Sequence, residues 1–177
     1  DVHTYIDNKS PKPTYAAIAA LKKSIEDAGR DVLLVDAGDH IQGTAYGSMD
    51  DGATIIELMN EAGYDLATPG NHEFDYGMAR AKAVLREADF PYVSCNWVDL
   101  RTGLNVLPSV KFFFVGGRKI AFVGVTTPET FTKSTPAYFM NDAQTKYIYD
   151  ILGGEDGQKL YDAVPVSYTH LRAHETG

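Results

Sequence analysis

Side chains that could do chemistry gather in three short stretches of the sequence, each where we expect a β-strand to end. They are Asp1 and His3, then Asp39 with Asp36 and His40 beside it, and finally Asn71, His72 and Asp75. Carboxylate, imidazole and amide groups without cysteine form a donor set for divalent cations such as Zn, Mn or Co. Parallel neighbouring strands bring their carboxyl ends to one edge of a sheet, where open α/β sheets bind ligands. The three clusters therefore predict one metal site assembled from distant parts of the chain.

The spacing within the clusters supports this prediction. Side chains alternate along an extended strand, so Asp1 and His3 would lie on one face and could bind one ion. Gly38 permits a tight turn in front of Asp39, whose two carboxylate oxygens could bridge two cations about 3.5–4 Å apart. The carbonyl of Asn71 could complete a coordination shell without adding charge.

Residues beside the clusters have plainer interpretations. We expect Asp36 to support a ligand or accept a hydrogen bond in its turn, and Glu73 to support its loop. We expect His40 to face solvent or substrate rather than a metal. Asn96 could support the site or simply pack, and Cys95 is expected to be a small buried residue.

The segments between the clusters alternate between helical and strand patterns, which indicates an α/β domain. Apolar residues three and four apart, with glycine after two of the runs, predict helices over 15–28, 53–62 and 78–88. Thr14 is expected to cap the first helix, with an apolar face of Ile18, Leu21 and Ile25. Strands are expected over 31–35, 66–68, 92–96, 112–115 and 120–125. The last two are joined through Gly116-Gly117-Arg118, which is typical of a β-hairpin. Residues 126–156 show too little periodicity to predict an element.

Composition excludes several classes of protein. Lys and Arg number 16 against 24 Asp and Glu, a net charge of −8, and hydrophobic residues make up 44%. This content is high enough for a core, and the chain has no basic stripe with which to bind a nucleic-acid polymer. Bound metal ions could still recruit phosphate substrates. The single cysteine excludes an internal disulfide framework, and no apolar run approaches the roughly 18 residues of a membrane span.

Three blocks, taken in order, resemble the calcineurin-like metallophosphoesterases. These blocks are Asp1-x-His3, Gly38-Asp39-x-x-x-Gly43 and Gly70-Asn71-His72-Glu73. The longer run Gly-Asn-His-Glu-Phe-Asp, residues 70–75, resembles the secreted or periplasmic 5′-nucleotidases. That group includes the bifunctional 2′,3′-cyclic-nucleotide phosphodiesterases/3′-nucleotidases. The resemblance covers residues 1–164 and implies the N-terminal part of an α/β metallophosphoesterase fold, with paired mixed β-sheets flanked by helices.

The resemblance also implies a role for each site residue. Asp1 and His3 would bind the first of two divalent metals, Asp39 would bridge both, and Asn71 would bind the second and contact substrate. His72 would contact the substrate phosphoryl group as a catalytic hydrogen-bond or proton donor, and Asp75 would hold its ring. The implied substrate is a nucleotide or other small phosphate ester, and the implied location is outside the cytoplasm.

The sequence departs from the family pattern at position 4 and near its end. Thr4 stands where the family has glycine, and we expect it to crowd the entrance to the site. Two later histidine blocks and the C-terminal nucleotide-binding domain are not recognisable. Residues 165–177 resemble a translated sequencing adapter, so we expect a foreign tail. The alternative is a native Thr169-His170 metal loop.

Three functions remain open at this point. The first is 5′-nucleotidase-like hydrolysis by the parent protein, with weak single-site metal binding and negligible turnover by this chain. The second is action on cyclic nucleotides or other phosphate esters, which a substrate panel would separate. The third is a non-catalytic surface domain that keeps the fold, against which the intact Asp39, Asn71, His72 and Asp75 set argues.

Overall fold

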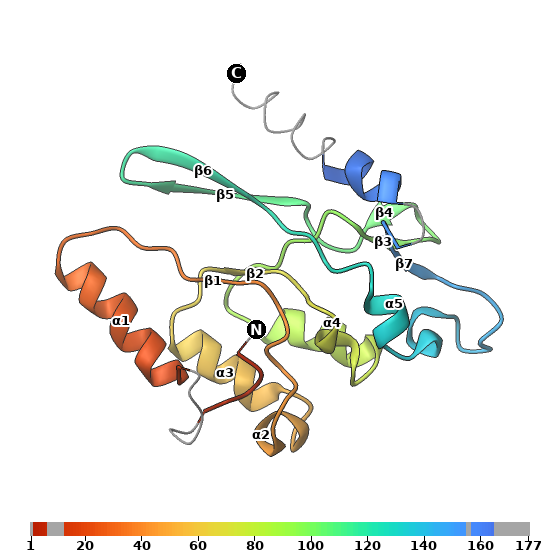
Figure 1. Cartoon of the computed structure of the whole chain (residues 1–177), viewed down its shortest axis with the longest axis horizontal. Coiled ribbons are helices and arrows are strands. Elements are labelled where there is room, and N and C mark those ends of the chain that lie inside the picture. The colour runs from red at the N-terminus through yellow and green to blue at the C-terminus, as the bar shows by residue number, and fades with distance from the viewer. Residues whose placement is uncertain (1, 7–12, 155–156, 165–177) are drawn as a thin grey trace.

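The computed structural model describes residues 2–6, 13–154 and 157–164 and confirms the predicted α/β class (Figure 1). Its helical elements are α1 (Tyr15–Asp27), α2 (Ala45–Ser48), α3 (Ala53–Glu61), η1 (His72–Phe74), α4 (Met78–Glu87), α5 (Thr130–Lys133) and η2 (Pro136–Phe139). Its strands are β1 (Val35–Asp36), β2 (Leu66–Ala67), β3 (Trp97–Asp99), β4 (Leu104–Asn105), β5 (Val110–Val115), β6 (Arg118–Val123) and β7 (Tyr149–Ile151). Residues 157–164 are also helical. Asp1 and the predicted foreign tail, residues 165–177, lie outside the described residues.

The strands form three small sheets of both orientations. β1 and β2 pair in parallel, and Tyr92 extends this arrangement through a parallel bridge to Ala67. β3 lies between β4 and β7 in an antiparallel sheet, and β5 pairs with β6 as the predicted hairpin. Gly116 and Gly117 form the hairpin turn with φ of 55° and 73°, the left-handed pair that such two-residue turns require. In Figure 1, α1, α3 and α4 lie along one side of β1 and β2, and the hairpin lies on the other.

The helices follow their sequence signals closely. The Thr14 side chain accepts a hydrogen bond from the backbone N–H of Ala17, as expected of an N-cap. α3 buries Ile55, Ile56 and Met59 completely or nearly so, and each such side chain contributes about 1.5–3 kcal/mol relative to full exposure. The predicted face of α1 is wrong at one position, because the Leu21 side chain is 63% exposed.

The parallel strands are shorter than predicted. Only Val35 of the apolar run 31–35 belongs to β1, because the backbone N–H of Leu34 donates to the Asp65 carboxylate instead of a strand carbonyl. The run 92–96 contributes one bridge, and the regular strand β3 begins at Trp97. After Val93 the backbone turns to other partners: Ser94 N–H donates to the Pro108 carbonyl, and Cys95 N–H donates to the Gly124 carbonyl.

Two apolar clusters form the core of the described part. One joins α1, α3 and α4 to the parallel strands, through residues that include Ile56, Met59 and Val84. The other surrounds Phe74 with Trp97, Phe139, Tyr149 and Ile151. Phe74 lies within the third polar cluster, between His72 and Asp75, so its burial anchors that cluster to the core. Cys95 is buried and free, as predicted.

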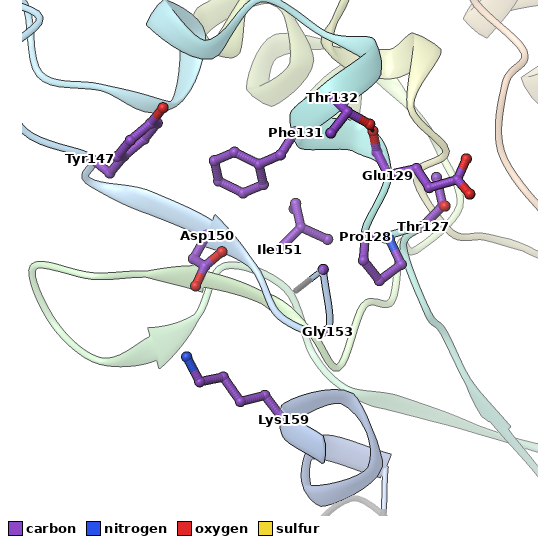
Figure 2. A pocket seen from close by; sticks show the side chains of 11 residues that line it. Thr127, Pro128, Glu129, Phe131, Thr132, Tyr147, Asp150, Ile151, Gly153 and Lys159 are labelled. Carbon is purple, nitrogen blue, oxygen red and sulfur yellow. Dashed lines mark hydrogen bonds between the residues drawn. The ribbon is translucent and has the colours of Figure 1, made fainter. Parts of the chain in front are cut away.

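An open groove of about 810 Å³ lies beside α5, β7 and the helical residues 157–164 (Figure 2). Apolar side chains such as Phe131, Tyr147 and Ile151 share its lining with Asp150 and Lys159. None of the described residues of the three predicted polar clusters lines it. Among the described residues, no helix has the length and apolar character needed to cross a membrane.

Candidate metal site

Parallel pairing of β1 and β2 brings the second and third polar clusters together. The loops that follow these strands touch at two glycines. A Cβ atom on Gly38 would lie 2.2 Å from the backbone nitrogen of Gly70, and one on Gly70 would lie 2.3 Å from Oδ1 of Asp39. No side chain fits at either distance, so both glycines are needed for the loops to approach. Gly38 also has a φ of 98°, a conformation that favours glycine.

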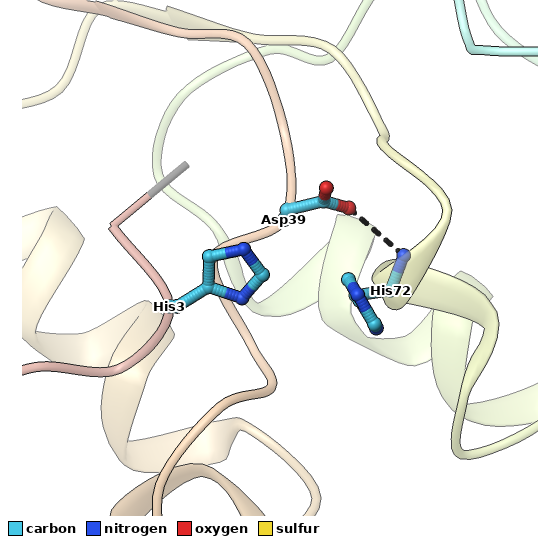
Figure 3. A group of neighbouring side chains, drawn as sticks. All are labelled: His3, Asp39 and His72. Carbon is cyan, nitrogen blue, oxygen red and sulfur yellow. Dashed lines mark hydrogen bonds between the residues drawn. The ribbon is translucent and has the colours of Figure 1, made fainter.

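His3, Asp39 and His72 converge on one point (Figure 3). One ligand atom from each residue lies within 4.8 Å of the other two, and all three side chains are half-buried. The backbone N–H of His72 donates to Asp39 Oδ1 at 2.9 Å, and the backbone N–H of His3 donates to the Asp39 carbonyl at 3.2 Å. The arrangement offers two imidazoles and a carboxylate to one space, a donor set that fits a divalent cation.

His3 reaches this position from a turn rather than from the predicted strand. His3 and Thr4 have φ of 53° and 56°, so the backbone there is left-handed and not extended. The expected alternation of Asp1 and His3 along a strand is therefore wrong for His3, and Asp1 lies outside the described residues. Nδ1 of His3 donates to the Gln42 carbonyl at 3.0 Å. In the neutral ring this leaves the lone pair on Nε2, the usual preparation of a metal-binding histidine.

His72 and Asp75 form the hydrogen-bonded pair that the family resemblance implies. Nδ1 of His72 lies 2.6 Å from Oδ2 of Asp75, and the two side chains are 32% and 24% exposed. The carboxylate accepts the Nδ1 proton, so Nε2 is the nitrogen with which His72 can bind an ion or, when protonated, donate to an anion. This geometry allows either role.

Asn71 lies at the start of η1 and is largely buried. Its backbone carbonyl accepts a hydrogen bond from the hydroxyl of Ser134, which ends α5. α5 also carries Lys133, whose pKa is raised mainly by its hydrogen bond to Glu129, with a contribution from the charge of Asp39. The sequence did not predict α5, because four residues are too few to show a helical period.

Glu73 supports its own loop, as the sequence predicted, and it also supports the loop after β1. Its Oε2 accepts the backbone N–H groups of Asp39 at 2.8 Å and Gly70 at 2.6 Å, and its Oε1 accepts that of His40 at 2.8 Å. The side chain is 3% exposed. One buried carboxylate therefore fixes the relative position of the loops that carry Asp39 and His72.

His40 does not face solvent or substrate, and that prediction is wrong. The side chain is completely buried, with Nδ1 donating to Asp36 Oδ1 at 2.8 Å and Nε2 lying 2.8 Å from the Tyr92 hydroxyl. Burial alone would lower the pKa of His40, but the carboxylates of Glu73 and Asp36 outweigh it and raise the pKa. Burial alone would raise the pKa of Asp36, and the hydrogen bond and charge of His40 outweigh it and lower the pKa.

Thr4 and Asn96 are both buried and have structural roles. Thr4 is buried rather than at the entrance, and its hydroxyl bonds with the Thr44 hydroxyl at 2.7 Å and accepts the Thr44 backbone N–H at 2.7 Å. Asn96 is also buried, and its amide donates to the backbone carbonyls of Thr126 and Leu152. Asn96 therefore joins strand ends and contacts none of the three polar clusters through these bonds.

Comparison with known proteins agrees with this geometry. The profile of the family described as calcineurin-like phosphoesterase matches residues 1–165. A snake venom 5′-nucleotidase from Gloydius brevicauda is 32% identical over 158 residues, covering 79% of this chain and 26% of that protein. The 5′-nucleotidase of Bos taurus is 36% identical over 126 residues, covering 68% of this chain and 22% of that protein. The solved structure of a 5′-nucleotidase precursor from Thermus thermophilus has a TM-score of 0.64 and 27% identity over 86% of this chain and 29% of its own.

The chain thus spans about a quarter of the length of the curated relatives it matches. The match runs through all three polar blocks and all of the described residues. The chain belongs to the calcineurin-like phosphoesterase family.

Proposed function

We propose that the protein containing this chain hydrolyses phosphate esters of nucleosides with the aid of two divalent metal ions. The observation that carries the proposal is the convergence of His3, Asp39 and His72 beside Asp75. The names of the relatives, which are 5′-nucleotidases, support a nucleotide substrate. The snake venom relative supports a location outside the cytoplasm.

Asp1 and His3 would hold the first ion, Asp39 would bridge the two, and Asn71 would bind the second. His3 suits this role because its Nδ1 is engaged by the Gln42 carbonyl. Asp39 suits it because Glu73 and His72 fix its backbone and one carboxylate oxygen. Bound divalent ions of this kind lower the pKa of a water molecule and offset phosphate charge. They also explain how a chain of net charge −8 would attract an anionic substrate.

His72 would act on the substrate rather than hold a metal. Asp75 accepts the proton on Nδ1 and so orients the ring, which leaves Nε2 to carry the proton that meets a phosphoryl or leaving-group oxygen. An imidazolium at this position would offset negative charge as it develops on those oxygens. Asp75 therefore acts through His72 and has no contact of its own with the substrate in this scheme.

Metal titration tests the proposal on the 177-residue chain. We expect Co²⁺ to bind weakly at a single site, with an absorption band that reports nitrogen and oxygen ligands. Asp39→Asn removes the central charge but keeps an oxygen for the His72 N–H, so it should lower the affinity at least tenfold without unfolding the chain. Exposed Asp27→Asn on α1 is the matched control. Equal Co²⁺ affinity in the Asp39 variant and the wild type would refute the metal site.

Activity tests the substrate. We expect negligible turnover of nucleoside 5′-, 3′- and cyclic monophosphates by the 177-residue chain, with or without added metal. A longer protein containing this chain should prefer one class of nucleoside phosphate ester and lose activity in chelator. Robust turnover by the 177-residue chain after rigorous removal of contaminating phosphatase would contradict the expectation that this chain alone is inactive.

A further inference from the structure

The backbone at Asp39 is held in a conformation that few residues other than glycine adopt. Its φ is 58°, directly after Gly38 at 98°. A left-handed conformation at a residue with a Cβ atom is unfavourable and persists only where neighbouring contacts impose it. The contacts that impose it also set the direction of the Asp39 side chain, and they come from buried groups.

A single oxygen fixes the residues on both sides of Asp39. Oδ1 of Asp36 accepts the backbone N–H of Gly38 at 2.7 Å and the ring Nδ1–H of His40 at 2.8 Å. The chain therefore closes on itself around Asp39. Removing the His40 ring nitrogen would leave the Gly38 bond in place and loosen the side that follows Asp39, where Glu73 would still accept the backbone N–H of His40.

His40 is fixed at its other nitrogen as well. Nε2 lies 2.8 Å from the hydroxyl of Tyr92, which is 4% exposed. Tyr92 forms the parallel bridge to Ala67 of β2, so its position is set by the sheet. The ring of His40 thus links the turn at Asp36 to Tyr92, which lies beside β2. Because it is 0% exposed, His40 contacts no molecule in solution.

We infer that His40 is a positioning residue for the metal site: tied to Asp36 and Tyr92, it holds Asp39 where its carboxylate meets His3 and His72. The inference rests on the proposed function, since it takes Asp39 as a metal ligand. Sequence alone pointed away from it, because a histidine next to a predicted ligand in a loop is more often solvated. Its burial depends on Tyr92, which lies far along the chain.

Two substitutions separate positioning from packing. In His40→Asn, the side-chain amide can take the place of Nδ1 and donate to Asp36, whereas His40→Leu fills space but donates nothing. We expect Co²⁺ affinity of the 177-residue chain to fall at least tenfold in His40→Leu and at most threefold in His40→Asn. Tyr92→Phe, which removes one hydroxyl, should give an intermediate loss. Ile151→Ala, a cavity variant in the other core cluster, should lower the melting temperature and leave the affinity unchanged.

A second measurement needs no metal. The backbone N–H of His72 donates to Asp39 Oδ1, so its hydrogen-exchange protection reports the direction of that carboxylate. We expect protection to fall at least tenfold in His40→Leu and to be largely retained in His40→Asn. If wild-type chain bound no Co²⁺, the proposed function would fail, and the exchange result alone would decide the role of His40.

Three results would overturn the inference. One is unchanged His72 protection in a folded His40→Leu or Tyr92→Phe variant. Another is an equal loss of Co²⁺ affinity and of His72 protection in His40→Asn and His40→Leu, which would show that the volume of the ring matters and its hydrogen bond to Asp36 does not. The third is a loss of Co²⁺ affinity in Ile151→Ala equal to that in His40→Leu, which would show that the affinity falls with the general stability of the chain.

Discussion

Glu73→Gln should destabilise the chain strongly although it changes one atom. The Glu73 carboxylate accepts three short backbone hydrogen bonds, from Asp39, His40 and Gly70 at 2.6–2.8 Å, and a longer one from the N–H of Ile41 at 3.5 Å. Glutamine keeps one acceptor oxygen, and its amide NH₂ would face a backbone N–H that it cannot accept. The best arrangement keeps the oxygen on Asp39 and Gly70 and leaves the buried N–H of His40 without an acceptor.

The size of the effect follows from these bonds. A buried donor without a partner costs about 1–3 kcal/mol, and each of the two remaining bonds loses about 1 kcal/mol when its acceptor becomes neutral. The expected loss of about 3–5 kcal/mol is a large part of the roughly 5–15 kcal/mol that stabilises a typical domain. Glu73→Ala would leave all four of these N–H groups without the Glu73 acceptor and is expected to prevent folding.

Urea unfolding followed by fluorescence measures this loss directly. Trp97 is the single tryptophan and is fully buried, so its emission reports the folded state. Glu57→Gln, the same substitution at an exposed position of α3, is the control and should change the free energy of unfolding by less than about 0.5 kcal/mol. A Glu73→Gln chain within about 1 kcal/mol of the wild type would show that the three bonds do not hold the loops, and the reasoning would be wrong.

Three further predictions test other parts of the molecule. In an active protein containing this chain, His72→Ala should reduce turnover by about 10²–10⁴-fold, the usual worth of a general acid, and leave the metal content nearly unchanged; loss of metal would instead make His72 a ligand. The raised pKa of His40 means that its contribution to stability is complete below pH about 6.5 and is lost as the pH rises through its folded value. The charged or titratable groups that face this ring are Asp36, Glu73 and Tyr92. Urea unfolding between pH 6 and 9 should therefore show falling stability in the wild type and a flatter profile in His40→Asn; parallel profiles would contradict the assignment. Gly117→Ala should cost about 1–2 kcal/mol, because φ there is 73°, whereas Gly157→Ala in the last described helix should cost nothing in the same unfolding assay; equal effects would show that the hairpin turn is not selective.

Sequence reasoning predicted the elements whose signals are local. The periodic Ile55, Ile56 and Met59 located α3, and Gly116-Gly117 located the hairpin turn, because helix faces and tight turns depend on neighbouring residues. It predicted the parallel strands as longer than they are, and it did not predict α5. Strand length was set by tertiary partners, such as the Asp65 carboxylate that takes the Leu34 N–H, and such partners leave no periodic trace in the sequence.

The candidate site shows the same division. The order of the three polar blocks was enough to predict that His3, Asp39 and His72 converge, and the structure brings them together. The sequence could not show which histidine of the second and third clusters is buried. His40 and His72 both follow loop residues, and only the distant Tyr92 and the two carboxylates around His40 distinguish them. The ligand roles of Asp1, His3, Asp39 and Asn71 remain predictions, as do the catalytic roles of His72 and Asp75.

The meeting of three distant segments at one point has a consequence for stability as well as for chemistry. Under the proposed function, an ion held by His3 and Asp39, with His72 beside it, would join the N-terminal turn to the loop after β1. A ligand that binds only the folded chain stabilises it by RT ln(1 + [L]/Kd), about 2.7 kcal/mol at a hundred times Kd. The ion would therefore serve as a reversible cross-link, and the free metal concentration would set how firmly the N-terminal turn stays attached to the sheet.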